Sequence, residues 1–201
     1  MQLLPLEPEI HGLLALMELQ ASRTAARKGQ DGRAVLLMEQ DRSMWDWAQI
    51  EQDMAELDTA QKLGGAAGFY ALQAAIVTCH ARASTAADTD WERIVLLYDA
   101  LLGIRPSPIV GLNRAVAVGM ARGPAAGLAA LDALAAEPAL ANYHLLPSVR
   151  GDLLLKLGRY AEARDELQRA IAMTENHREH ELLSKKLRQI PNNSQDANQA
   201  S

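Results

Sequence analysis

The chain has 201 residues, of which 36 are Ala, 31 are Leu and only eight are aromatic, and its formal net charge at pH 7 is −5. This composition argues against β-sandwiches and barrels, which need β-branched and aromatic residues, and the single Cys79 excludes a disulfide framework or a cysteine-based zinc site. No apolar run is long enough to span a membrane, and no secretory signal opens the sequence. We therefore expect a soluble, cytoplasmic, nearly all-helical protein without direct nucleic-acid contact, because its basic residues are scattered among acids.

Three helices are predicted in the first 85 residues, from apolar side chains that recur at helical spacing. They cover about residues 7–27, 43–64 and 68–83. Ser43 is expected to cap the second of them. Residues 33–40 are too short for a packed helix alone and are expected to be extended.

The fourth helix has a strong start signal. Thr89 and Glu92 have the spacing of a capping box, in which the two side chains accept from opposite backbone N–H groups. Apolar residues then recur along one face as far as Leu102. Asp88 and Asp90 are interpreted as helix-start residues rather than catalysts, because acids favour the first turn of a helix.

From Pro106 onward the sequence predicts shorter helices separated by glycine and proline. They are expected at about 108–121, 124–136, 143–157, 160–173 and 175–189. Gly123 and Gly158 lie 35 residues apart, each between two of these helices. A helix–turn–helix period near ~34 residues is the tetratricopeptide signature, with an ordinary α-hairpin bundle as the alternative.

These elements predict an all-α fold of about nine helices, in which hairpins stack as a tetratricopeptide-like right-handed superhelix. Residues 1–87 form an N-terminal helical part that does not show the repeat, and residues 88–190 form the repeated hairpins. Residues 191–201 carry almost no apolar side chains and are expected to be disordered.

No residue pattern typical of an active site is present: there is no Ser/His/Asp order, glycine-rich phosphate loop or acid pair on one helix face. His177, His180 and Glu181 share a helix face and are the best metal-ligand candidates, but a solvated polar face is the favoured interpretation. Cys79 and His80 point about 100° apart on a helix, which argues against a joint nucleophilic site. No enzyme activity, cofactor or metal is expected.

Two polar segments stand out among the apolar helices. Residues 39–47 combine several charges with two tryptophans, and Asn113 and Arg114 lie within an otherwise apolar helix. Such groups need partners inside the fold or on another protein, and internal bonds are favoured over a binding role. The candidate interaction residues are Asp41, Arg42, Trp45, His80, Asn113 and Arg114.

Seven stretches carry a family resemblance in their order and spacing. They are LEPEIHGLLALMELQASR (6–23), EQDRSMWD (39–46), YALQAAIVTCHA (70–81), TDWERIVLLYDALL (89–102), PSPIVGLNRAVAVG (106–119), GPAAGL (123–128) and NYHLLPSVRGDLLLKLGR (142–159). In these stretches the chain resembles the C-terminal extension of bacterial extracytoplasmic-function RNA polymerase sigma factors that have a tetratricopeptide-like tail. Residues 66–69 (AAGF) depart from the family pattern, which has Gly-Pro before Tyr70.

The resemblance implies a regulatory or interaction module that tunes transcription initiation through contacts with the sigma core domains, RNA polymerase or another protein regulator. The promoter-binding sigma domains are expected to lie outside this chain, which is either their excised extension or a separately encoded relative. Two alternatives stay open: a freestanding adaptor for another protein or peptide, and a small-molecule sensor or enzyme. The latter predicts a polar pocket around Asp41, Arg42, Trp45, Gln73, His80 and Arg114.

Overall fold

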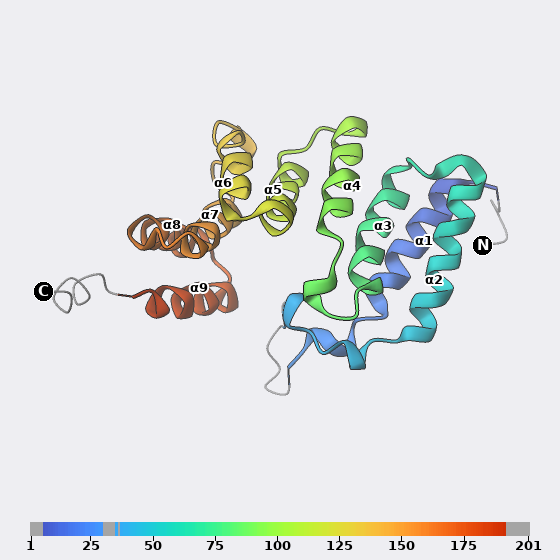
Figure 1. The fold of residues 1–201 in the computed structure, drawn as a ribbon, viewed down its shortest axis with the longest axis horizontal. Coiled ribbons are helices and arrows are strands. Elements are labelled where there is room, and N and C mark those ends of the chain that lie inside the picture. The colour runs from blue at the N-terminus through green and yellow to red at the C-terminus, as the bar shows by residue number, and fades with distance from the viewer. Residues whose placement is uncertain (1–5, 30–34, 36, 192–201) are drawn as a thin grey trace, which may run out of the picture. The chain divides into compact units, whose positions relative to one another are not determined.

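The computed structural model describes residues 6–29, 35 and 37–191. In these residues it contains nine α-helices and no strand, which confirms the prediction of an all-α protein built from helical hairpins (Figure 1). Two compact units are present, one ending at Pro106 and the other beginning at Ser107. The division falls after the fourth helix, which packs against the third.

Among its described residues, the first unit contains four α-helices that lie side by side (Figure 1). They are α1 (Pro8–Ala21), α2 (Trp47–Ala60), α3 (Phe69–Arg82) and α4 (Trp91–Ile104). Helix α1 packs against both α2 and α3, and α4 packs against α3. Gly12 allows the close approach of α1 to α3, since a Cβ at this position would lie 2.7 Å from the backbone nitrogen of Ala71. The shared core contains Ala15, Leu19, Ile50, Leu57 and Ala74.

The connection between α1 and α2 differs from the expected one. Helix α1 ends at Ala21, earlier than predicted, and the chain continues through short 3₁₀ turns at Ala25–Arg27, Leu37–Glu39 and Arg42–Met44. The expected extended segment 33–40 therefore contains a 3₁₀ turn at its end, while residues 33, 34 and 36 lie outside the described residues. Asp46, rather than Ser43, caps α2 by accepting from the backbone N–H of Gln49 (3.0 Å).

A neighbouring helix supplies the cap at the start of α3. Gly68 occupies the N-cap position and has no side chain with which to accept a hydrogen bond. Oε2 of Glu9, from α1, accepts from the backbone N–H of Tyr70 (3.2 Å). The helix therefore begins as predicted although AAGF replaces the family pattern.

The capping box predicted for α4 is wrong in its residues. Asp90 is the N-cap and accepts from the backbone N–H of Arg93 (2.9 Å). A capping box is present one turn earlier, at the start of the 3₁₀ turn Ala86–Asp88. There the carboxylate of Asp88 accepts from the backbone N–H of Thr85 (3.0 Å). Asp90, rather than Thr89, is the N-cap because α4 begins at Trp91, directly after Asp90. An aspartate at this position can accept from a backbone N–H of the first turn. Asp88 and Asp90 are therefore helix-start residues, as interpreted from the sequence.

As far as residue 191, the second unit contains five α-helices, which begin and end within four residues of the predicted limits. They are α5 (Pro108–Arg122), α6 (Pro124–Asp132), α7 (Leu145–Lys156), α8 (Tyr160–Met173) and α9 (His177–Gln189). Helices α5 and α6 form one hairpin, α7 and α8 a second, and α9 packs against α8. Gly123 (φ 94°) and Gly158 (φ 72°) connect the paired helices in the left-handed region that favours glycine. The tail predicted to be disordered lies, from residue 192 on, outside the described residues.

None of the described helices is long and apolar enough to cross a lipid bilayer.

Candidate functional site

Three of the six candidate interaction residues lie together in the first unit. The guanidinium of Arg42 lies over the ring of Trp45, with 4.9 Å between Cζ and the ring centroid. Its Nη1 donates to the backbone carbonyl of His80 (2.6 Å) and also to that of Ala83. These carbonyls are at the C-terminal end of α3, where a helix leaves acceptors unpaired and attracts positive charge. Arg42 therefore ties the segment before α2 to the end of α3.

Two further residues complete this group. Arg23 also lies near the Trp45 ring, at 5.7 Å from Cζ to the centroid, and its Nη2 donates to Oε1 of Gln20 (2.7 Å). Trp47 stacks on Trp45 with 5.9 Å between ring centroids. We refer to Arg23, Arg42, Trp45, Trp47 and His80 as the Arg–Trp cluster.

Burial sets the electrostatics of the Arg–Trp cluster. Arg23, Trp45 and His80 are only 6%, 3% and 8% exposed. Burial, followed by the nearby charges of Arg27 and Arg42, lowers the pKa of Arg23 to about 10. Burial, followed by the charges of Arg23 and Arg42, lowers the pKa of His80 to about 4, so this imidazole is neutral at pH 7.

Several polar atoms of the cluster have no hydrogen-bond partner within the described residues. They are Nε of Arg23, Nη2 of Arg42, Nε1 of Trp45 and Nδ1 of His80. An unpaired buried donor costs about 1–3 kcal/mol. The cluster is thus an electropositive, donor-rich group to which a carboxylate would be complementary.

The other candidate residues are Asp41, which comes directly before Arg42 in the sequence, and Asn113 and Arg114, which belong to the second unit. Asp41 is exposed, and its carboxylate accepts from the backbone N–H (2.9 Å) and the hydroxyl (2.7 Å) of Ser43, bonds that lower the pKa of Asp41. Asn113 is exposed and Arg114 half-buried on α5, in the second unit. The residues of the expected polar pocket are therefore divided between the two units. Nε2 of Gln73 donates to the carbonyl of Phe69 in its own helix (3.4 Å).

Sequence reasoning missed Arg23 and Trp47 as members of the site. Trp47 follows Trp45 at a spacing of two, and this pair was a usable signal in the 39–47 segment. Arg23 follows the end of α1 with no pattern that distinguishes it from a solvated arginine. Its role depends on the turn that brings Ser22 against Asp46, whose backbone N–H donates to the Ser22 carbonyl (3.0 Å).

A pocket of about 380 Å³ lies in the first unit, between α2, α3 and the start of α4. We call it the α2–α3 pocket. It contains none of the six candidate interaction residues. Its lining consists of Met54, Leu57, Asp58, Gln61, Ala75, Thr78, Cys79, Arg82, Ala83, Asp88, Asp90 and Arg93.

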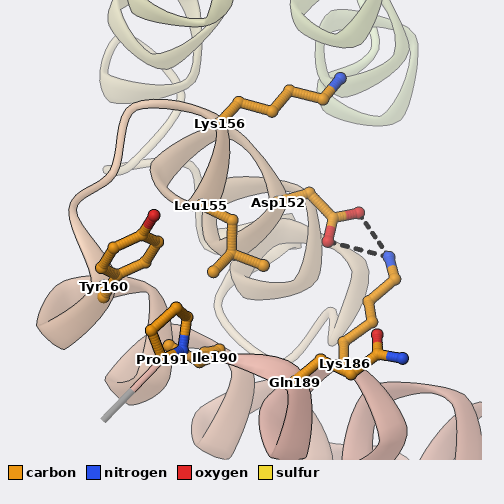
Figure 2. A pocket seen from close by; sticks show the side chains of 8 residues that line it. All are labelled: Asp152, Leu155, Lys156, Tyr160, Lys186, Gln189, Ile190 and Pro191. Atoms are coloured by element: carbon orange, nitrogen blue, oxygen red, sulfur yellow. Dashed lines mark hydrogen bonds and ion pairs between the residues drawn. The ribbon is translucent and has the colours of Figure 1, made fainter. Parts of the chain in front are cut away.

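A second pocket, of about 430 Å³, lies in the second unit between α7, α8 and α9 (Figure 2). Its main charges neutralise each other, because Nζ of Lys186 lies 2.6 and 2.8 Å from the carboxylate oxygens of Asp152. Lys156 extends away from this pair in Figure 2, and its Nζ lies 3.6 Å from Sδ of Met120. We therefore interpret this pocket as part of the packing contact between α9 and the α7–α8 hairpin.

Comparison with known proteins gives two matches. Residues 1–61 match DUF6596, a family of unknown function, and this range holds every member of the Arg–Trp cluster except His80. An uncharacterized protein of Rhizobium meliloti (strain 1021) is 46% identical over 176 residues, which cover 88% of this chain and 41% of the relative. The chain thus spans about two fifths of that relative's length. No solved structure matches the chain.

Proposed function

We propose that the chain is the regulatory and protein-interaction domain of a sigma factor of the extracytoplasmic-function type. It tunes transcription initiation by contacting the sigma core domains or RNA polymerase. The observation that carries this proposal is a contact between two of the stretches that resemble the sigma-factor extension. Arg42 and Trp45 come from EQDRSMWD, His80 comes from YALQAAIVTCHA, and their side chains and carbonyls form the Arg–Trp cluster.

The exposed part of this cluster, together with Met44, has the chemistry of a protein interface. Trp47 and Met44 are 42% and 48% exposed, next to a half-buried arginine. Tryptophan and arginine are the residue types most enriched among those that dominate binding energy at protein interfaces, and methionine is also enriched in such surfaces. The electropositive cluster favours a partner that presents an acidic side chain among apolar ones.

The size of the relative is compatible with this role. Because 176 residues are 41% of it, the relative is about 430 residues long and has about 250 residues outside the match. Two domains of ordinary size, at about 100–150 residues each, fit in that length. Sigma core domains in that region would be covalently attached partners of the module.

The test is promoter-directed transcription by the full-length protein that contains this chain. Removal of the chain, or Met44→Ala combined with Trp47→Ala, is expected to change initiation at least about tenfold, the effect of losing an interface hot spot. Lys62→Gln, an exposed change in the same unit, is the matched control. Unchanged transcription after removal of the chain would contradict the proposal. Binding to a partner that is neither sigma domain nor polymerase would favour an adaptor instead.

A further inference from the structure

We propose that the α2–α3 pocket binds a free α-amino acid with an apolar side chain. This site is separate from the Arg–Trp cluster, and the proposal does not depend on the role in transcription. It would add a ligand-sensing function to the first unit. The volume of about 380 Å³ lies in the lower part of the ~300–1,000 Å³ range of small-ligand sites.

The buried part of the α2–α3 pocket lining is apolar apart from Thr78, whose hydroxyl donates to the carbonyl of Ala74 (2.9 Å). Leu57 from α2 and Cys79 from α3 are buried, at 5% and 7% exposure. Met54 and Ala75 are half-buried beside them. These side chains form a surface on which an aliphatic or thioether side chain would leave water.

The rim of the pocket carries three aspartates, two of which already serve the chain's own backbone. Asp88 accepts from the backbone N–H and the hydroxyl of Thr85 (3.0 and 2.9 Å). Asp90 accepts from the backbone N–H of Arg93 at the start of α4 (2.9 Å), where the helix dipole favours a negative charge. Asp58, exposed near the end of α2, makes no such cap and is the acid left to meet a ligand.

The two arginines of the rim lack carboxylate partners within the described residues. Nε of Arg82 lies 3.4 Å from Sδ of Met54, and a thioether sulfur is a weak acceptor. Arg93 lines the same pocket as Arg82 and Cys79. Burial raises the pKa of the Cys79 thiol, and the positive charges of Arg93 and Arg82 partly offset this rise.

This arrangement matches a zwitterion. Arg82 and Arg93, which line the same pocket, offer several donors to one carboxylate, the pairing for which arginine is best suited. Asp58 offers a carboxylate to an ammonium group, and the apolar surface of Leu57 and Cys79 accepts the side chain. A phosphate ligand would bring about two negative charges beside three aspartates, which like-charge repulsion disfavours.

The experiment is titration calorimetry of the whole chain with L-leucine, L-methionine and L-phenylalanine. At least one is expected to bind saturably with one site per chain. L-leucinamide, which lacks the carboxylate, and 4-methylpentanoate, which lacks the ammonium, are expected to bind at least about tenfold more weakly than L-leucine, since each loses a charge-assisted contact. Absence of saturable binding by all three amino acids up to about 10 mM, weaker than any useful affinity, would overturn the proposal.

Two variants locate the binding. Arg82→Gln and Asp58→Asn alter exposed side chains and are expected to leave the circular dichroism spectrum unchanged while weakening amino-acid binding at least about tenfold. Lys62→Gln, exposed and outside the pocket lining, is expected to bind as the native chain does. Equal affinity of all three variants, or tighter binding of a leucine-containing peptide than of free leucine, would contradict the assignment.

Discussion

The backbones of Gly119 and Gly127 are in direct contact where α5 crosses α6. A Cβ atom on Gly127 would lie 2.7 Å from Cα and 3.0 Å from the nitrogen of Gly119, and 3.1 Å from the carbonyl oxygen of Ala115. All three neighbours are backbone atoms, which cannot rotate away as a side chain does. In the α7–α8 hairpin a Cβ on Gly151 would meet the side chain of Leu167 at 2.9 Å, a neighbour with more freedom to adjust.

Gly127→Ala is therefore expected to force α5 and α6 apart and to lower the free energy of unfolding by about 1–3 kcal/mol, the usual cost of overpacking. Gly103→Ala, in α4, is the control because a Cβ there meets nothing within 4 Å. It is expected to stabilise the chain by about 0.5–1 kcal/mol, since alanine loses less backbone entropy than glycine. Urea unfolding followed by circular dichroism measures both, and equal effects of the two substitutions would contradict the packing described.

We expect substitutions of Arg42 to lower the stability of the first unit and not that of the second. Arg42→Ala removes two charge-assisted bonds to carbonyls and the contact with the Trp45 ring. We expect a loss of about 2–4 kcal/mol, and about half of that for Arg42→Lys, whose single ammonium cannot reproduce the fork of donors.

Tryptophan fluorescence is the appropriate measurement for the Arg42 variants, because all three tryptophans of the chain lie in the first unit. Arg82→Gln is the matched control: its guanidinium lies 3.4 Å from a thioether and has no bond to a carbonyl among those described. If Arg42→Ala unfolds at the same urea concentration as Arg82→Gln, the bonds to α3 do not stabilise the unit.

The sequence predictions are accurate where single residues mark a turn or the start of a helix. The second unit was predicted within a few residues because Gly123 and Gly158 mark its turns, and because Ser107 and Pro108 mark the start of α5. The end of α1 was not predictable, since apolar spacing continues past Ala21 and the turn there depends on a bond between distant residues.

The candidate site was only partly predictable, for a similar reason. Polar residues in distinctive stretches identified Arg42, Trp45 and His80, which do meet. Arg23 was missed because its place depends on tertiary contact with the Trp45 ring. The α2–α3 pocket was missed as well, since its rim combines side chains from three helices that no local pattern relates.

Helix α9 is expected to be held by its apolar face rather than by its ion pair. Leu183 is buried against the core formed with Ala163 and Leu167, so Leu183→Ala should cost about 2–4 kcal/mol. Lys186→Ala removes a half-exposed pair with Asp152 and should cost at most about 1 kcal/mol. Amide hydrogen exchange of α9 distinguishes the two, and faster exchange in Lys186→Ala than in Leu183→Ala would contradict this order.

Asp53 and His80 give the first unit two opposed responses to pH. Asp53 is buried on α2, and burial, followed by the adjacent Glu18, raises its pKa from 3.8 to about 7. Between these values the folded chain keeps a proton that the unfolded chain releases, so stability falls as pH rises. For His80, with its pKa lowered from 6.5 to about 4, the unfolded chain binds the extra proton and stability rises with pH.

Asp53→Asn separates these two responses. Above its folded-state pKa of about 7, Asp53 carries a buried negative charge, which the variant lacks. At pH 8 the free energy of unfolding of the variant should therefore exceed that of the native chain by at least about 1 kcal/mol, after allowance for solvent screening. The difference should shrink as the pH falls from 7 towards 4, because Asp53 is then neutral in the folded native chain as well. Because the variant lacks the opposing effect of Asp53, its free energy of unfolding should rise more steeply than that of the native chain between pH 4 and 6.5. This is the range between the folded-state and unfolded-state pKa values of His80. Urea unfolding followed by tryptophan fluorescence at pH 4.5, 6 and 8 measures this, and a difference that stays constant with pH would show that Asp53 ionises in the folded chain as it does in the unfolded one.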